Sequence, residues 1–346
     1  IMSNTIFRVA IVGCGGIHHE HARALACLPG VVLTQVCDSK PERADASAAL
    51  YGCRAVYDAK TVFESDEVDG VHICTPHYLH GPMAIEAMRC GKYALVEKPM
   101  AGNLAQAREM IAVSDSLGGR LGVIFQNRYL KAARRLRQII TGREMGELLG
   151  IRGTVAWKRT PEYYSDDWHG RWATECGGVM MNQAIHTLDI LQWCTGRPAT
   201  RVSGRISTDG LGEYIEVEDT AHIRIEFEGG LVGTFYATVA GSENEPVEIH
   251  ARLEGGRLLY RSGWLYRWES DGRLTLLVAP ERQAKGDKAY WGIGHRAQLE
   301  DYYRSVLGGT PIWLDGRQAI SSLEIVRALY AASRSGQPVT LPWKGE

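Results

Sequence analysis

The sequence predicts an α/β protein of two domains: a doubly wound parallel sheet, then an α+β domain with a large, mostly antiparallel open sheet. The length of 346 residues favours two domains, because one domain usually takes about 150 residues. Short apolar runs alternate with helical stretches in the first half, whereas long alternating runs between glycine-rich turns fill the second half. We therefore predict domains at 1–127 and 128–346.

The first half contains the strand and helix signals of a parallel sheet. Five apolar runs predict buried strands at 7–12, 31–37, 70–74, 93–96 and 120–125. Helical spacing and good helix formers predict helices at 21–28, 41–51, 79–90 and 104–117. Strand-helix repetition forces parallel pairing through right-handed crossovers, so we expect helices on both faces of the sheet.

The second half changes to an antiparallel pattern. We expect a helix at 132–141, a strand at 148–158 and a helix around 178–193. Alternating runs predict a meander of strands at 200–208, 215–227, 231–240, 246–253, 257–261 and 274–278. Two last helices are expected at 297–307 and 317–335, the second ended by Gly336 and Pro338.

Composition excludes several function classes. Lys and Arg (39) balance Asp and Glu (40), so no net field favours nucleic acid or an anionic membrane. Nothing approaches about 18 unbroken apolar residues, and we expect a cytoplasmic protein. The eight cysteines form no C-x-x-C pair, which argues against disulfides and a structural zinc.

The first predicted strand leads into Gly13-Cys14-Gly15-Gly16-Ile17-His18, a G-x-G-x-x-H turn in which His18 replaces the usual third glycine. An ordinary strand-to-helix loop could share this pattern. However, Asp38 ends the second strand, where a carboxylate would accept hydrogen bonds from the adenosine ribose hydroxyls. A helix N-terminus after the turn would favour a pyrophosphate. The combination predicts a dinucleotide-binding Rossmann domain.

The same region bears on the choice of dinucleotide. The Asp38 carboxylate would repel a 2′-phosphate, which favours NAD. Ser39, Lys40 and Arg43 lie close enough to compensate, so NADP stays an alternative.

Two segments follow predicted parallel strands at the edge where ligands bind: Thr75-Pro76-His77-Tyr78-Leu79-His80 and Glu97-Lys98-Pro99. The Lys98 ammonium could stabilise negative charge on a substrate oxygen during hydride transfer. A solvated lysine is the plain alternative. Pro99 restricts the backbone beside Lys98 and is a candidate for a cis peptide bond.

These segments together resemble the glucose-fructose oxidoreductase and myo-inositol dehydrogenase (Gfo/Idh/MocA) family of two-domain NAD(P)-dependent oxidoreductases. The resemblance covers nearly the whole chain. It rests on the Gly13 turn, Thr75-Pro76 with His80, Gly91-Lys92 through Pro99, Gln126-Asn127-Arg128, Gly177-Gly178 through His186-Thr-Leu-Asp189, and the helix after Asp315-Gly316. Glu-Lys-Pro followed by Gly-Gly and His-x-x-Asp is more specific than the glycine turn.

The resemblance implies an oxidoreductase for a ring secondary alcohol of a sugar, sugar derivative or cyclitol, with no nucleic-acid or membrane partner. It further implies a homodimer or homotetramer assembled through the exposed face of the second sheet. Lys98 takes the position of the family's catalytic lysine and His186 that of its general acid or base. The cofactor-binding residues expected are Gly13, Gly15, Gly16, Ile17, Asp38, Ser39, Thr75, Pro76, His77, His80, Glu97, Lys98 and Gln126.

His186 fits this role independently, because an imidazole can take an alcohol proton near neutral pH. Asn182 and Asp189 share its helical stripe. Asn182 is the third candidate catalytic residue. Many family members have Asp where Asn182 stands, and we interpret the amide as a change in substrate contacts. Asp189 could fix the His186 tautomer, or the two could be a polar pair on a wet helix face.

The remaining candidate substrate residues lie in an aromatic segment and at the domain junction. Aromatic faces stack on sugar rings and Arg binds hydroxyl or carboxylate groups, although an oligomer contact or a packed loop would look alike. With Asn182 and His186, the predicted substrate-binding residues are Asn127, Arg128, Tyr164, Trp168, Arg171 and Trp172. The histidines at 18–21 and 77–80 have no carboxylate or Cys at metal-site spacing, so we predict no metal.

Two rival functions stay open. A non-catalytic sensor could use the same fold to bind a dinucleotide and a partner protein, although retention of Lys98 and His186 argues against this. An NAD-dependent enzyme could instead cleave glycosides by transient ring oxidation. Absorbance at about 340 nm and product analysis distinguish the three.

Overall fold

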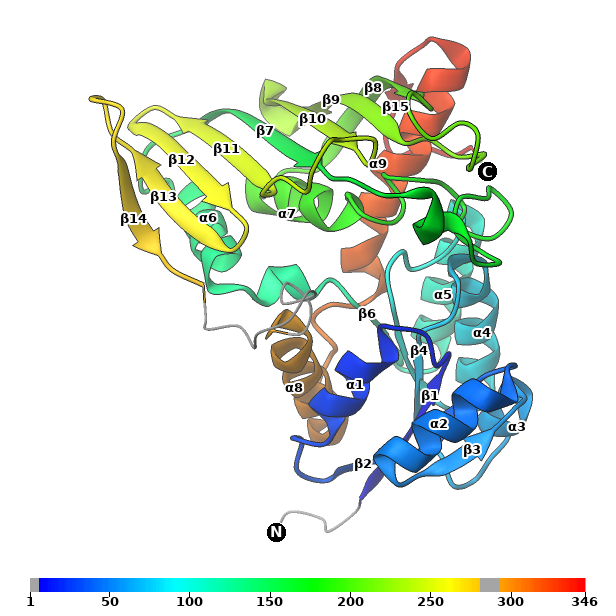
Figure 1. The fold of residues 1–346 in the computed structure, drawn as a ribbon. Coiled ribbons are helices and arrows are strands. Elements are labelled where there is room, and N and C mark those ends of the chain that lie inside the picture. Colours follow the sequence, from blue (N-terminus) through cyan, green and yellow to red (C-terminus); the bar gives the residue numbers. More distant parts are fainter. Residues whose placement is uncertain (1–5, 281–292, 346) are drawn as a thin grey trace. The chain divides into compact units, whose positions relative to one another are not determined.

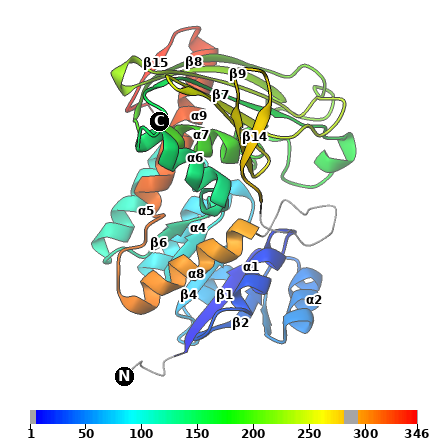
Figure 2. The same ribbon diagram turned by 90° about the vertical axis from the view of Figure 1, so that its left-hand side faces the viewer.

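A computed structural model describes residues 6–280 and 293–345, which form two compact units (Figures 1 and 2). The first unit comprises Ile1–Gln126 and Lys285–Ile320, and the second comprises Asn127–Ala284 and Ser321–Glu346. The first unit therefore includes a segment from near the end of the chain.

The first unit contains a six-stranded parallel sheet in the order β3-β2-β1-β4-β5-β6. This confirms the doubly wound parallel sheet. Its elements are β1 (Phe7–Val12), α1 (His18–Leu25), β2 (Val31–Cys37), α2 (Pro41–Tyr51), β3 (Arg54–Val56), α3 (Ala59–Phe63), β4 (Gly70–Ile73), α4 (His77–Arg89), β5 (Tyr93–Val96), α5 (Leu104–Ser116), β6 (Leu121–Val123) and α8 (Ile293–Gly308). The elements β3 and α3 were not predicted, because three and five residues are too few for a periodic signal.

Helices cover both faces of this sheet. Figure 2 shows α1 and α8 in front of the strands and α4 and α5 behind them. Consecutive residues of β1, from Val9 to Ile11, are fully buried, as a strand covered on both faces requires. Leu299 and Tyr302 of α8 pack into the same core as α1.

The second unit contains a nine-stranded sheet in the order β14-β13-β12-β11-β7-β10-β9-β8-β15. The strands are β7 (Leu148–Ala156), β8 (Ala199–Ser207), β9 (Thr220–Phe227), β10 (Val232–Thr238), β11 (Glu248–Leu253), β12 (Gly256–Arg261), β13 (Trp264–Trp268), β14 (Leu274–Val278) and β15 (Val339–Thr340). Pairing is antiparallel except between β10 and β7. The mostly antiparallel sheet is confirmed, but the simple meander is wrong, because β7 lies between β10 and β11.

One face of this sheet carries the helices of the second unit. In β9, Ile223 and Ile225 are buried while His222 and Arg224 are exposed, which is the alternation expected of a strand covered on one side. Helices α6 (Lys131–Thr141) and α7 (Ile185–Thr195) pack together against the sheet (Figure 1). The helix α9 (Gly316–Ser335) continues from the first unit into the second.

The helix α7 begins later than predicted. Residues 178–184 form turns rather than regular helix. Here a Cβ on Gly178 would lie 1.9 Å from the carbonyl oxygen of Glu218, so the backbone docks closely on the next segment. The Glu218 carboxylate accepts hydrogen bonds from the Gly178 and Met180 N–H groups (2.9 and 3.1 Å), which fixes this turn before α7.

All eight cysteines have free thiols. No helix in the described ranges, 6–280 and 293–345, has the length and apolar character needed to cross a bilayer.

Candidate active site

The glycine turn follows β1 and requires glycine at its first position. Gly13 has φ +96°, and a Cβ there would lie 2.6 Å from the carbonyl atoms of Cys74. A Cβ on Gly15 would meet nothing within 4 Å. No side chain caps the N-terminus of α1, which follows the turn. A tight turn, an open surface and an uncapped helix N-terminus are what a pyrophosphate needs.

His18 does not fill this turn. Its ring is 2% exposed and is held by Gly15 and Ser47. The Gly15 carbonyl can only accept, so Nδ1 carries the proton and Nε2 accepts from the Ser47 hydroxyl at 2.9 Å. Burial lowers the pKa of His18. The residue that replaces the third glycine therefore ties the loop to α2.

Asp38 is oriented by two backbone donors. Its Oδ2 accepts from the Cys14 N–H at 2.8 Å, and its Oδ1 accepts from the Lys40 N–H at 2.9 Å. Each carboxylate oxygen can accept a second hydrogen bond. The carboxylate thus stands beside the glycine turn in a fixed orientation, with capacity for the hydroxyls of a ribose.

The loops after β4 and β5 are joined by His80. Its Nε2 lies 2.8 Å from the Thr75 carbonyl oxygen and its Nδ1 lies 2.7 Å from that of Pro99. Burial lowers the pKa of His80, although the two carbonyl acceptors oppose this. The Lys98–Pro99 bond is cis, as the sequence suggested. His80 thereby holds the loop that carries Lys98 against the loop that carries Thr75.

Two buried polar atoms at this edge lack hydrogen-bond partners in the described part of the chain. They are Thr75 Oγ1 and Gln126 Oε1. A buried polar atom without a partner is costly, and a bound polar ligand is one way to satisfy it. With the Gly13 turn and the Asp38 carboxylate, these atoms make the carboxyl edge of the sheet fit a dinucleotide.

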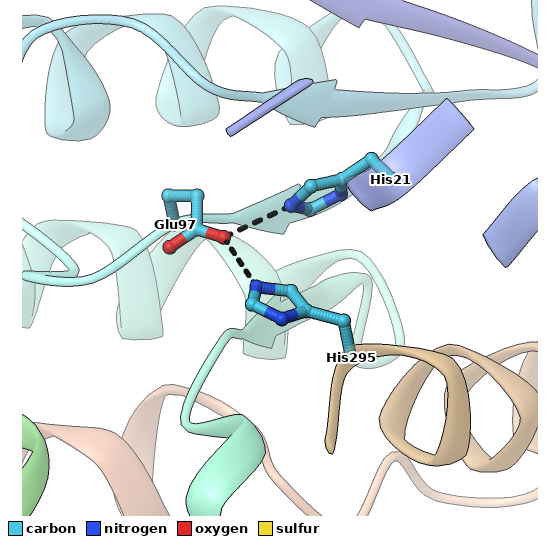
Figure 3. Close-up of side chains that lie close together, drawn as sticks. All are labelled: His21, Glu97 and His295. Carbon is cyan, nitrogen blue, oxygen red and sulfur yellow. Dashed lines mark hydrogen bonds and ion pairs between the residues drawn. The ribbon is translucent and has the colours of Figure 1, made fainter. Parts of the chain in front are cut away.

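The Glu97 carboxylate follows β5 and accepts hydrogen bonds from two buried imidazoles (Figure 3). His21 Nε2 lies 2.9 Å and His295 Nε2 lies 3.2 Å from Oε1. The other oxygen, Oε2, accepts from the backbone N–H of Lys98 at 3.2 Å. Glu97 therefore links α1 and α8 to the backbone of the predicted catalytic lysine.

This hydrogen-bonded chain continues away from Glu97. His21 Nδ1 lies 2.9 Å from His72 Nδ1, and His72 Nε2 lies 2.6 Å from the Tyr303 hydroxyl. An ionised Glu97 only accepts, so the Tyr303 hydroxyl donates to His72, His72 to His21, and His21 to Glu97. Both rings are neutral in this assignment. We call these four residues and His295 the histidine relay.

The charge states follow from the surroundings of the relay. Burial lowers the pKa of His21 and holds that of His72 well below its ordinary value. Burial alone would raise the pKa of Glu97, but the two imidazole hydrogen bonds outweigh it and hold this pKa well below its ordinary value. An ionised Glu97 with neutral His21 and His72 is the resulting state.

Ligand atoms of His21, Glu97 and His295 lie within 4.8 Å of one another, which is compatible with a cation. Their hydrogen bonds account for this placement without one. This cluster was not predicted from the histidines near 18–21 and 77–80, because His295 is remote from them in sequence. His72, a polar residue inside an apolar strand, was the available signal.

In the second unit His186 lies in the first turn of α7, and Asp189 lies one turn later. Asp189 does not interact with His186. Its carboxylate binds Arg128 through two hydrogen bonds (2.7 and 2.6 Å) and accepts from the Ser322 hydroxyl (2.6 Å). Both side chains of the pair are 1% exposed. Both interpretations of Asp189 are therefore wrong, and its pairing with Arg128 is part of the packing of the second unit.

A polar cluster surrounds Asn182 before α7. Its Nδ2 donates to Glu175 Oε1 at 2.6 Å and to the Tyr163 hydroxyl at 3.3 Å. The Tyr163 hydroxyl also lies 3.3 Å from Gln183 Nε2 and 3.2 Å from His169 Nε2. Burial raises the pKa of Tyr163 to about 12. Tyr163 and Glu175 were not among the predicted residues, since nothing in the local sequence marks their convergence.

The predicted aromatic segment includes η2 (Pro161–Tyr164) and the loop after it. Tyr164 is buried in the second unit. Trp168 packs against His169 with ring centroids 3.7 Å apart. Arg171 and Trp172 are exposed, and Trp172 Nε1 donates to the Glu216 carbonyl oxygen at 2.8 Å.

The other predicted residues lie in the following elements. Gly16 and Ile17 are in the turn before α1 and Ser39 is in the loop after β2. Pro76 and His77 begin α4, and Asn127 is in η1 (Gln126–Tyr129). Lys98 belongs to the first unit and His186 to the second.

Comparison with known proteins gives two matches to family models. Residues 7–125 match a model described as an oxidoreductase family with an NAD-binding Rossmann fold. Residues 133–259 match the GFO/IDH/MocA C-terminal domain.

Similar proteins cover nearly the whole chain. The D-glucoside 3-dehydrogenase of Escherichia coli K12 is 27% identical over 98% of this chain and 99% of its own. The scyllo-inositol 2-dehydrogenase (NAD⁺) of Bacillus subtilis 168 is 28% identical over 97% of each. The crystal structure of the WlbA dehydrogenase from Bordetella pertussis, in complex with NADH and UDP-GlcNAcA, is 26% identical with a TM-score of 0.87, over 99% of this chain and 100% of that one.

Proposed function

Because the chain belongs to the Gfo/Idh/MocA family of NAD-binding oxidoreductases, we propose that it oxidises a ring secondary alcohol of a sugar, sugar derivative or cyclitol, or reduces the ketone. The observation that carries this proposal is the dinucleotide cradle of the first unit. Gly13 tolerates no side chain, and Asp38 is oriented beside the turn by two N–H donors. Thr75 Oγ1 and Gln126 Oε1 need the polar partners that a dinucleotide would supply.

When bound, NAD⁺ accepts a hydride from the carbinol carbon. In this proposal His186 removes the hydroxyl proton, and the Lys98 ammonium stabilises the charge that grows on the same oxygen. The histidine relay supports this assignment of Lys98, because Glu97 fixes its backbone N–H. Asn182 contacts the substrate from the second unit. Convergence of Lys98 and His186 on one oxygen is part of the proposal.

We further propose that NAD is preferred over NADP. Both oxygens of Asp38 already face backbone donors, so the carboxylate is held in place and a 2′-phosphate there would meet a fixed negative charge. Titration of the protein with NADH and NADPH, followed by fluorescence, should give the tighter binding for NADH. Tighter binding of NADPH would show that Lys40 or Arg43 compensates.

The substrate range is suggested by the relatives. They are named as dehydrogenases of D-glucoside at position 3, D-apiose and inositol at position 2, and one solved relative holds UDP-GlcNAcA. We infer that this chain acts on a secondary hydroxyl of such a ring. The panel for testing it comprises glucosides, inositols, apiose and UDP-linked uronic acids.

The test is NADH formation from each panel compound by wild type, Lys98→Ala and His186→Ala. Both variants should lose turnover by about 100-fold or more, while NADH affinity changes little. Lys60→Ala is the control, because Lys60 is exposed. Unchanged turnover of Lys98→Ala would remove this lysine from the mechanism.

The same panel separates the rivals. NADH binding without turnover of any compound would support a sensor. Release of an aglycone without net NADH formation would support glycoside cleavage through transient ring oxidation.

We also propose a homodimer or homotetramer that uses the open face of the second sheet. This face presents a hollow lined by side chains that include Arg152, His222, Arg224 and Tyr236. Light scattering after size exclusion gives the mass, and Arg224→Glu should shift it towards the monomer. A monomeric wild type would contradict the proposal.

A further inference from the structure

His18 donates two hydrogen bonds to the Gly15 carbonyl oxygen in the glycine turn. One comes from the ring Nδ1–H and the other from the backbone N–H of His18 at 3.3 Å. A carbonyl oxygen has two lone pairs, so one residue uses the full accepting capacity of this oxygen. The Gly15 carbonyl therefore points towards the His18 ring, which is buried.

The direction of this carbonyl fixes the direction of the next N–H group. The Gly15–Gly16 peptide bond is trans, since the cis bonds of the described chain precede Pro99 and Pro342. In a trans peptide the C=O and N–H bonds point in opposite directions. The Gly16 N–H thus points away from the His18 ring, and Gly16 is exposed. A Cβ on Gly15 would meet nothing within 4 Å, so the backbone here leaves room for a ligand.

The other nitrogen of the ring is tied to α2. His18 Nε2 accepts from the Ser47 hydroxyl at 2.9 Å. The ring also packs on that of His19, with centroids 3.9 Å apart. Burial lowers the pKa of His18, so the ring is neutral at neutral pH and carries one proton. That proton lies on Nδ1, because the Gly15 carbonyl can only accept.

We propose that His18 is a positioning residue for the cofactor, which orients the Gly15–Gly16 peptide so that its N–H donates to the pyrophosphate of the dinucleotide. A glycine in place of His18 would leave only the backbone N–H to hold the carbonyl. The usual third glycine lets the helix pack closely on the strand, whereas this chain holds the turn with a side-chain hydrogen bond. This inference rests on the dinucleotide cradle of the proposed function, and His18 acts on the cofactor only through the peptide that it orients.

Asparagine and glutamine separate the roles of the two ring nitrogens. The amide nitrogen of Asn is as many bonds from Cα as His Nδ1, so H18N keeps a donor for Gly15 and loses the link to Ser47. The amide of Gln is as many bonds from Cα as His Nε2, so H18Q keeps an acceptor for Ser47 and loses the donor to Gly15. H18G loses both.

The experiment measures NADH affinity by fluorescence titration, and Tm, for wild type and the three variants. H18Q and H18G should bind NADH about tenfold more weakly, the effect of one misdirected hydrogen bond to a charged group, and H18N should stay within about threefold of wild type. A purely structural His18 would instead make NADH affinity follow Tm. Competition against NADH locates the defect. ADP-ribose, which contains the pyrophosphate, should lose affinity in H18Q, whereas adenosine, which contains no phosphate, should bind all variants alike.

H19G is the matched control, because His19 follows His18 in the first turn of α1 and glycine has the same cost in helix propensity there. It should bind NADH like wild type. Equal losses in H18N and H18Q, or an H18Q variant that binds NADH as tightly as H19G, would overturn the inference while the cradle stands. An equal loss of adenosine and ADP-ribose affinity in H18Q would place the defect outside the pyrophosphate and would also overturn it. A wild type that binds no NADH would overturn the cradle and this inference with it.

Discussion

Acidification from about pH 7.5 to about 5.5 should weaken the first unit through the histidine relay. His21 and His72 are neutral in the folded protein, and burial lowers the pKa of each. In the unfolded chain each titrates near about 6.5. Below that pH the unfolded state therefore binds more protons than the folded state, and the free energy of unfolding must fall as the pH falls.

The magnitude follows from two protons. A ring that stays neutral in the folded protein but gains a proton in the unfolded chain lowers the free energy of unfolding by about 1.4 kcal/mol over this interval. The two rings together lower it by about 2.7 kcal/mol. His18, His19 and His80 of the same unit also have lowered pKa values because of burial, so they add to this loss, and about 2.7 kcal/mol is the part due to His21 and His72. The depressed pKa of Glu97 stabilises the fold above about pH 4.5 and is lost only as the pH falls below that, outside the interval.

Amide hydrogen exchange of peptides covering β4 and β5 measures this free energy for the first unit. Tryptophan fluorescence is less suitable, because most tryptophans lie in the second unit. His72→Phe should reduce the pH-dependent loss by about 1.4 kcal/mol, one proton's share, whatever it does to stability itself. His222 lies in the second unit, so His222→Gln should leave the exchange of these peptides unaltered. A loss below about 1 kcal/mol in wild type would mean that the rings are protonated in the folded state and would refute the direction assigned to the relay.

Three further substitutions test other parts of the structure. Arg128→Met leaves the Asp189 carboxylate buried and unpaired and should cost about 3–5 kcal/mol in urea unfolding of the second unit; a loss below about 1 kcal/mol would indicate solvent access. Gly13→Ala forces a Cβ to 2.6 Å from the neighbouring backbone and should weaken NADH binding by about tenfold or more in a fluorescence titration. Glu97→Gln keeps an oxygen for the imidazoles but places an amide NH₂ against the Lys98 N–H. We expect kcat to fall about tenfold with NADH affinity retained. Equal losses in kcat and in NADH affinity would indicate damage to the cradle.

The predictions that succeeded rest on local patterns. Apolar runs between helices located the parallel strands. The Gly13 turn and Asp38 lie side by side because both follow strand ends, and their binding of a dinucleotide stays a proposal. The cis peptide at Pro99 was also anticipated from the local sequence.

The features that were missed depend on contacts between remote segments. His295 meets Glu97 across 198 positions and Ser322 meets Asp189 across 133. Neither pairing leaves a periodic trace in the sequence. Likewise, β7 lies between β10 and β11, and the alternation of residues along one strand does not encode which strands become its neighbours.

The return of the chain to the first unit has a consequence for synthesis on the ribosome. Residues 7–125 supply all six strands of the parallel sheet, yet Tyr302 and Tyr303, which close its core, belong to α8. The N-terminal part of a nascent chain therefore keeps this apolar surface uncovered until α8 has emerged. A chaperone or transient self-association would have its greatest effect during that interval, and a truncation after residue 127 should yield aggregates where full-length protein does not.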